Sequence, residues 1–460
     1  MTPALSSAIF GPVFADPEVA GLLSDRAYVG ALLEVEVALA RAQAELGLIP
    51  ERAASAIERA AAGLAFDPAA LAAGVRRDGV PVVALVEQLR AALAPEDTQY
   101  VHRGATTQDI VDTATVLVAR RVLAHLDAGL GHLARELGRL ARAHRGSVMA
   151  ARTHAQQALP TSFGLKAAGW ALPLARHRDR LAELTPRLGV LQLGGAAGTL
   201  LAFGPRAFEL EQRLALALGL GVPELPWHAQ RDAIAELGAW LALLTGSLGK
   251  LAQDVILLCQ SEVAEVSEAP HGERGGSSSM PHKNNPMRSE QILAAARAVA
   301  AQSSALMHAL VQEHERGTHG WQLEWLCVSP MALLASGALA GALELVRGLV
   351  VFPERMRENL LREHGLVLAE PAALALSLEL ERAEASALVR SCAGRALAEK
   401  RFLIDVLREV VLAKHPTARI DWAALARPEE HLGQASALLD RALARLERAF
   451  SLVPDPVAGG

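Results

Sequence analysis

The sequence predicts an all-α protein built around a bundle of long helices. Ala and Leu recur at three- and four-residue spacing along most of the 460 residues, the pattern of helices with one apolar face. Alternating runs of β-branched residues are sparse, and aromatic residues make up only 4% of the chain. Because 51% of the residues are hydrophobic, the chain can bury a large core and is not a disordered protein.

The helical segments can be followed in order along the chain. The first begins after Ser24, a good N-cap, and ends at the stop signals Gly47 and Pro50. Shorter helices follow as far as Pro95. Three long helical stripes are then predicted, at 110–146, 230–266 and 286–311. The first of these contains no proline and implies one helix of about 50 Å.

The segment 325–343 carries no charge and is close to the length of a membrane helix. Its Ala, Gly and Ser content and Pro330 make it only weakly lipophilic, so we interpret it as a buried bundle helix. From residue 351 onward, prolines break the pattern into shorter helices. We therefore predict three domains, at 1–108, 109–350 and 351–460.

Composition and charge exclude several classes of protein. The net charge is −5 without any block of like charges, which argues against a nucleic-acid partner. The first residues lack the basic start of a signal peptide, so we expect a cytoplasmic protein with no membrane partner. The three cysteines are far apart without C-x-x-C spacing, which excludes a disulfide framework and a zinc site.

Helices this long usually bury their length against partner helices, which predicts a homotetramer. Three polar segments interrupt the apolar scaffold: HRGATTQD at 102–109, RTHAQQALPTS at 152–162 and GGSSSMPHKNNPMRSE at 275–290. Each is expected at the end of a long helix, where free backbone donors favour anions. Because they lie at different helix ends, we expect the three segments to meet across subunit boundaries.

Spacing excludes three common chemistries. Lys283 lacks the preceding Gly and the following Ser or Thr of a phosphate-binding P-loop. No lysine stands three residues after Ser277 or Ser278, as penicillin-interacting enzymes require. His314 and His319 are five residues apart, so they would not share a helix face to bind zinc. We therefore predict neither a metal nor a cofactor.

The third segment places serine hydroxyls beside a cation. Lys283, Asn285 and the amides behind the two glycines can stabilise a serine alkoxide and make it a proton acceptor. Lys283 and Asn285 can also hold a carboxylate whose charge grows as a neighbouring C–H bond is deprotonated. For this segment alone, the alternative is a solvated Gly/Ser loop.

The same residues resemble the signature of the fumarase/aspartase superfamily. The third segment matches G-S-S-x-M-P-x-K-x-N-P followed by Glu at every fixed position: Gly276, Ser277, Ser278, Met280, Pro281, Lys283, Asn285, Pro286 and Glu290. Residues 102–113 and 153–160 resemble the superfamily's other two regions, with Thr107 where the family usually has Ser.

This resemblance implies a cofactor-free enzyme with the superfamily's three-domain helical fold. It implies that Ser277 transfers the proton and that His154 lies opposite it. Substrate-binding roles are implied for Lys283, Asn285, His102, Thr106, Thr107 and Gln156. A shift of one residue in the loop would give the role of Ser277 to Ser278.

Over most of the chain, the resemblance is to the cycloisomerases of this superfamily, on stretches such as 193–200 and 312–325. It implies a small polycarboxylate substrate: a conjugated diene tricarboxylate that is closed to a lactone. The alternative is a lyase that releases fumarate from adenylosuccinate, which would need donors for a purine and a phosphate. A helical scaffold without activity is disfavoured by the complete set of site residues.

Overall fold

The computed structural model describes residues 2–268, 280 and 283–451. In this part the chain is predominantly helical, which confirms the predicted fold class. Two compact units can be distinguished. The first comprises 1–128, 177–246 and 295–338, and the second comprises 129–176, 247–294 and 339–460. The predicted domain boundaries at 108 and 350 stay a prediction.

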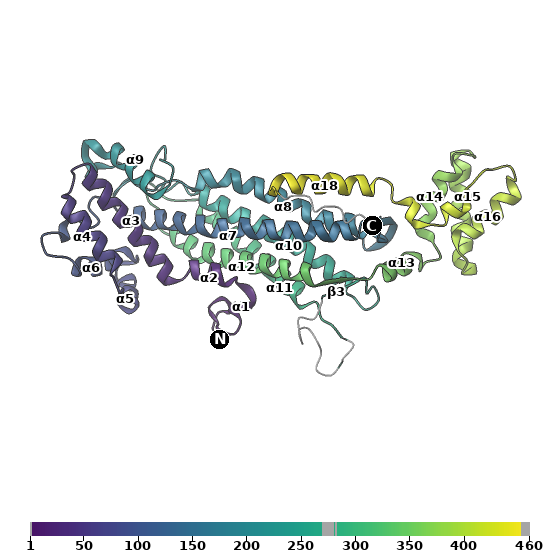
Figure 1. Cartoon of the computed structure of the whole chain (residues 1–460), viewed down its shortest axis with the longest axis horizontal. Helices are drawn as coiled ribbons and strands as arrows, with labels where there is room; N and C mark the ends of the chain where they lie inside the picture. The colour runs from purple at the N-terminus through teal and green to yellow at the C-terminus, as the bar shows by residue number, and fades with distance from the viewer. Residues whose placement is uncertain (1, 269–279, 281–282, 452–460) are drawn as a thin grey trace. The chain divides into compact units, whose positions relative to one another are not determined.

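Five long helices each contribute residues to both units (Figure 1). They are α7 (Thr107–Ala143), α8 (Phe163–Leu188), α10 (Asp232–Leu258), α11 (Met287–Ala309) and α12 (Gly320–Gly348). Leucines at positions 126, 130, 133 and 137 repeat at three- and four-residue intervals along α7, and each is 0% exposed. The apolar stripe read from the sequence is therefore the buried face of this helix.

The first unit also contains a group of shorter helices. Ser24 caps α3 as predicted, because its hydroxyl accepts the N–H of Ala27 at 3.3 Å. The helices α3 and α4 pack together, as do α3 and α9 (Figure 1). The helices of this group are α1 (Gly11–Phe14), α2 (Pro17–Leu22), α3 (Asp25–Glu45), α4 (Glu51–Ala62), α5 (Pro68–Asp78), α6 (Val82–Ala91) and α9 (Ala207–Leu218), with 3-10 turns at Ala4–Ser6, Thr98–Tyr100 and Leu201–Arg206.

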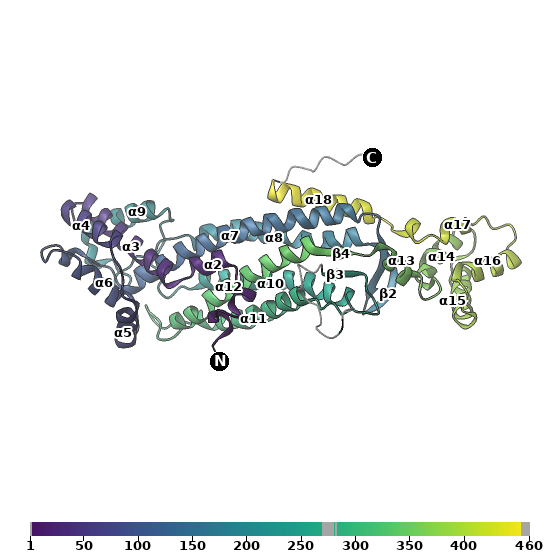
Figure 2. The ribbon, with the colours of Figure 1, turned by 60° about the horizontal axis from the view of Figure 1, so that its bottom comes forward.

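The second unit ends in short helices, as the prolines after residue 351 predict. These are α13 (Pro353–Leu361), α14 (Ala369–Leu376), α15 (Arg382–Glu399), α16 (Leu403–Lys414), α17 (Trp422–Leu425) and α18 (Ala435–Phe450), with 3-10 turns at Leu366–Leu368 and Pro428–His431. The helices α14 to α17 form a cluster (Figure 2). In contrast, α18 returns to α7, where Arg145 contacts Asp440 at 3.0 Å and Arg142 pairs with Glu447.

Two short antiparallel sheets were not expected from the sequence. The strand β1 (Val148–Thr153) pairs with β2 (Gln156–Ser162), and β3 (Val266–Glu268) pairs with β4 (Leu349–Val351). The predicted helix 230–266 ends at Leu258. Turns follow at 259–263, Ala264 has a φ of +49°, and the chain then enters β3. Strands of three to seven residues have too little alternation to be recognised from sequence.

By length and composition, α10 and α12 could each cross a membrane. In the structure they are core helices of the bundle, and 50% and 56% of their most apolar 18-residue windows are buried. Residues 325–343 lie within α12, which agrees with their interpretation as a bundle helix.

The close approach of α8 to the end of α7 generates a stability test. A methyl group on Gly164 would lie 2.5 Å from the carbonyl oxygen of Ala141 and 2.8 Å from Cα of Arg145. We expect Gly164→Ala to lower the free energy of unfolding by about 1–3 kcal/mol, measured by urea denaturation. The control is Gly169→Ala in the same helix, where a methyl group meets nothing within 4 Å. It should be neutral or stabilising by up to about 1 kcal/mol. Equal stability of the two variants would contradict the packing described here.

Candidate active site

The first polar segment forms the N-terminus of α7, as predicted. Thr106 precedes the helix, and its N–H donates to the carboxylate of Asp109 at 3.0 Å. A carboxylate in the first turn that reaches back to the preceding N–H closes the helix end. Thr106 and Thr107 are therefore held at a defined helix start.

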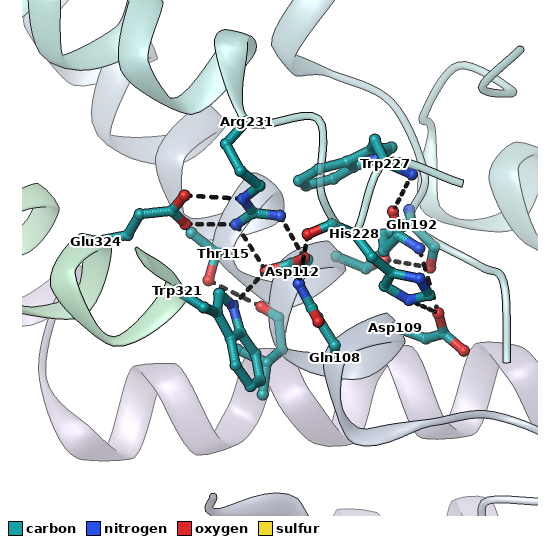
Figure 3. A network of polar contacts seen from close by, with 12 residues as sticks. Gln108, Asp109, Asp112, Thr115, Gln192, Trp227, His228, Arg231, Trp321 and Glu324 are labelled. Atoms are coloured by element: carbon teal, nitrogen blue, oxygen red, sulfur yellow. Dashed lines mark hydrogen bonds and ion pairs between the residues drawn. The ribbon is translucent and has the colours of Figure 1, made fainter. Parts of the chain in front are cut away.

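The Asp109 carboxylate also fastens this helix start to distant loops. It is 1% exposed. Besides Thr106, its donors among the described residues are the N–H groups of Gly194 and Gly195 at 2.9 Å each, Nε2 of Gln192 at 3.3 Å and Nε2 of His228 at 2.8 Å. Hydrogen bonds to a charged acceptor are each worth about 1.5–3 kcal/mol, which offsets the cost of burying the carboxylate. Figure 3 shows His228 and Gln192 converging on this side chain.

One turn further along α7, a buried guanidinium joins two carboxylates (Figure 3). Arg231 contacts Asp112 at 2.6 Å and, through Nε, Glu324 at 2.8 Å. The side chains of Arg231 and Asp112 are 2% exposed and that of Glu324 is 6% exposed. Trp321 donates its indole N–H to Asp112 at 2.9 Å, and the ring of Trp227 lies 4.9 Å from the guanidinium carbon.

Burial and pairing act in opposite directions on these groups. Burial lowers the pKa of Arg231, but Asp112 and Glu324 raise it more, so its pKa lies above the usual value. Burial raises the pKa of Glu324, and Arg231 lowers it only in part. Arg231 is therefore needed to stabilise the two buried carboxylates, because without it they would lack an ion-pair partner.

Arg316 contacts Thr106 of the predicted site, although no sequence pattern singled it out. Its Nη1 donates to the hydroxyl of Thr106 at 2.8 Å, and its Nε donates to Gln108 at 3.2 Å. Because the Thr106 oxygen accepts from a cation, its own proton is left to donate to an anion. Arg316 lies in the stretch 312–325, which resembles the superfamily but is less diagnostic than the three polar segments.

His102 is held from one side by a carboxylate. Its Nδ1 lies 2.6 Å from Oε1 of Glu36, and its side chain is 18% exposed. Burial lowers the pKa of His102, but Glu36 raises it more, so the pKa lies above its usual value. His102, Thr106 and Thr107 belong to one short segment of the first unit, and their substrate-binding roles stay a prediction.

The second polar segment is a β-hairpin, which corrects the expectation that it lies at a helix end. Only its last residue fits that expectation, because the hydroxyl of Ser162 caps α8 by accepting the N–H of Leu165 at 3.1 Å. His154 and Ala155 form the two-residue turn, with φ of +48° and +63°. Turns of this type favour Asn-Gly, so His-Ala is held there at a conformational cost. His154 and Gln156 are exposed at the tip.

A buried carboxylate, Glu265, binds Arg152 in the first strand of this hairpin. Glu265 is 0% exposed, receives both terminal nitrogens of Arg152 at 2.9 and 2.6 Å, and accepts Nδ2 of Asn359 at 3.0 Å. Gln157 in turn donates to the Asn359 carbonyl at 3.0 Å. A cavity of about 430 Å³ lies beside these groups and is bordered by Gln156.

The third polar segment leads into α11, as predicted, but its helix end is already occupied. Glu268 accepts the N–H groups of Arg288 and Ser289 at 3.0 and 2.9 Å. The expectation that this N-terminus offers free donors to a substrate anion is therefore wrong for these two amides. Asn284 is tied to β3 through the Ser267 hydroxyl at 2.9 Å, next to the exposed Lys283 and half-buried Asn285.

Ser277 and Ser278 lie outside the described residues. Within the part of the chain that the structure describes, no group of three or more His, Cys, Asp or Glu side chains could hold a metal ion. The described positions offer imidazoles, hydroxyls, amides and the cations Lys283 and Arg316, which are groups suited to acid–base and electrostatic chemistry.

Comparison with known proteins gives consistent matches. A family model described as Lyase matches residues 14–301. The 3-carboxy-cis,cis-muconate cycloisomerase of Pseudomonas aeruginosa is 42% identical over 459 residues, covering 99% of this chain and 100% of that protein. The nitrosuccinate lyase of Streptomyces davaonensis is 41% identical, covering 97% and 96%. The crystal structure of the 3-carboxy-cis,cis-muconate lactonizing enzyme from Pseudomonas putida has a TM-score of 0.91 at 40% identity, covering 97% and 100%.

The buried ion cluster generates a pH-dependent prediction. Replacing Arg231 by Leu leaves Asp112 and Glu324 unpaired, which should cost about 3–5 kcal/mol of unfolding free energy at pH 8. Without Arg231, the pKa of Glu324 rises further. A carboxyl group whose folded pKa exceeds its unfolded pKa destabilises the fold fully above the folded pKa. This effect shrinks as the pH falls below the folded pKa and is gone below the unfolded pKa.

Urea unfolding should therefore show a smaller loss for Arg231→Leu at pH 5 than at pH 8. The control Arg213→Leu breaks an exposed ion pair with Glu45 and should change stability by about 1 kcal/mol or less at either pH. An equal loss for Arg231→Leu at both pH values would argue against an unpaired carboxylate as the cause.

Proposed function

The chain belongs to the lyase family of the fumarase/aspartase superfamily, and on this premise we propose that it is a 3-carboxy-cis,cis-muconate cycloisomerase. The observation that carries the proposal is the end-to-end likeness to such enzymes, in sequence over 99% of the chain and in structure with a TM-score of 0.91. The product is 4-carboxymuconolactone, an intermediate of the protocatechuate branch of the β-ketoadipate pathway.

The proposed reaction is an isomerisation without a cofactor. An oxygen of one substrate carboxylate bonds to a carbon of a double bond, and the neighbouring carbon, α to another carboxylate, takes up a proton. The carboxylate becomes a lactone ester, and the proton comes from an enzyme group that recovers it from solvent, so the trianionic substrate gives a dianionic product and no other atom is gained or lost. The charge that develops on the second carboxylate must be stabilised, which requires fixed donors or cations.

The roles of the residues follow the superfamily pattern. Ser277 and His154 are the proton-transferring pair, and Lys283 and Asn285 hold the carboxylate whose charge grows. The other substrate carboxylates are bound by His102, Thr106, Thr107 and Gln156, with Ser278 beside Ser277. The contact of Arg316 with Thr106 supports an anion at that position, since it leaves the threonine proton free to donate.

We propose a cytoplasmic homotetramer with sites shared between subunits. His154 and Gln156 are exposed, yet proton transfer to carbon is favoured where water is excluded. A second subunit would provide this cover. Large apolar side chains on the long helices support such contacts: Leu257 is 48% exposed, Leu326 71% and Met307 45%.

A second candidate is a fumarate-releasing lyase. It is favoured by the 41% identity to a nitrosuccinate lyase, which is nearly as high as that to the cycloisomerase. The same proton-transfer and carboxylate-binding residues would serve an elimination from a substituted succinate, because that reaction also forms an anion α to a carboxylate.

The assignment of the proton-transferring serine predicts the behaviour of two neighbouring variants. Ser277→Ala should lower kcat by about 100-fold or more, the contribution of a positioned proton-transfer group, with an unchanged circular dichroism spectrum. Ser278→Ala is the matched control and should retain most of the activity. If Ser278→Ala is inactive and Ser277→Ala is active, the two roles are exchanged.

The substrate is tested by comparing ultraviolet spectra and products. Lactonisation removes a conjugated diene, so the purified protein should abolish the absorbance of 3-carboxy-cis,cis-muconate without a second product. It should do so after exhaustive chelation and without an added cofactor. Nitrosuccinate and adenylosuccinate, tested in parallel, should yield no fumarate. Fumarate from either one, with the muconate unchanged, would replace the cycloisomerase by a lyase.

A further inference from the structure

Glu36 in α3 is a buried carboxylate with only half of its hydrogen-bonding capacity used. It is 2% exposed, and its Oε1 lies 2.6 Å from Nδ1 of His102. Its Oε2 is buried without a hydrogen-bond partner among the described residues. A half-satisfied buried carboxylate destabilises a fold, so stability alone does not explain this residue.

A second buried side chain of α3, Gln43, contacts Arg103, the residue after His102. Gln43 follows Glu36 by seven residues, which is two helical turns, and is also 2% exposed. Its Nε2 donates to the carbonyl oxygen of Arg103 at 2.7 Å. Between these contacts His102 has a φ of +60°, a region that residues with a side chain rarely adopt. Two buried polar side chains of one helix thus fix the backbone and the ring of His102.

The geometry leaves one ring nitrogen of His102 available. Nδ1 faces the Glu36 carboxylate and so carries a proton, while Nε2 has no hydrogen-bond partner among the described residues. The charged groups around the ring come from three helices: Glu36 from α3, Asp109 from α7 and Arg90 from α6. The two carboxylates favour the imidazolium, whereas Arg90 disfavours it.

We propose that Glu36 is a positioning residue for His102, which holds the imidazole as a cation that donates through Nε2 to a substrate carboxylate. This inference rests on the proposed function, because it takes the ligand to be a polycarboxylate. Glu36 itself does not touch the substrate. It acts by orienting His102, in the way that a carboxylate behind a histidine fixes its tautomer and ring position.

The test compares two substitutions of Glu36 with a control on the same helix. Glu36→Gln keeps an acceptor for Nδ1 but removes the charge, so kcat/KM should fall by about 10- to 100-fold, mainly through KM. The alkaline limb of the pH profile should move to lower pH, because the imidazolium loses its carboxylate. Glu36→Asp restores the charge and should recover part of the loss. Glu34→Gln removes an exposed ion pair with Arg121 and should behave as the wild type.

If Glu36 had a purely structural role, the folded Glu36→Gln enzyme would have the wild-type KM and the wild-type pH profile. That result would overturn the proposal. Binding is measured separately by NMR on protein labelled at histidine Cε1, with the His102 signal assigned from His102→Gln. Propane-1,2,3-tricarboxylate should shift this signal in the wild type and require a higher concentration in Glu36→Gln.

The NMR experiment distinguishes the two hypotheses. If the wild type does not convert the muconate but the tricarboxylate shifts His102 more weakly in Glu36→Gln, the proposed function fails and the role of Glu36 stands. If the muconate is converted and both proteins respond equally to the tricarboxylate, the role of Glu36 is wrong. Should Glu36→Gln not fold, the same comparison is made with Glu36→Asp, whose shorter side chain should weaken the response.

Discussion

The arrangement of the first polar segment depends on the carboxylate of Asp109 at the start of α7. This group is buried, and it gathers donors from Thr106 and from residues more than 80 positions later in the chain. A buried carboxylate without hydrogen bonds would destabilise the fold, so the return of these loops to α7 stabilises the unit. The helix end that carries Thr106 and Thr107 is thereby fixed before any ligand binds.

The other polar segments are supported by the same device. Glu265 holds Arg152 at the base of the His154 hairpin, and Glu268 closes the first turn of α11 behind Lys283. Glu265 is buried and Glu268 is half-buried, and both accept hydrogen bonds from neighbouring donors of the scaffold. An apolar helical bundle can thus carry polar segments while N–H groups at its helix ends are bonded internally.

The cluster of Arg231, Asp112 and Glu324 illustrates the cost of such support. Burial disfavours the charge on Arg231 and on Glu324, and their close pairing offsets this cost in the core. The cluster joins α7 to α12, and Arg316, which shortly precedes α12 in the chain, contacts Thr106 at the start of α7. Stability and the geometry of the site are therefore coupled in this unit.

Features that are encoded locally could be predicted from the amino-acid sequence alone. The apolar stripe predicted α7 to within three residues at each end, Ser24 marked the start of α3, and the polar segments contained His102, Thr106 and Lys283. Only the tertiary structure decided which groups hold them: Glu36 behind His102, Arg316 on Thr106, and Glu268 at α11. It also turned residues 148–162 into a hairpin, which puts His154 at a tip instead of a helix end. Helix periodicity and caps depend on neighbours three or four residues away, whereas these partners are 20 to 210 residues apart and leave no local pattern.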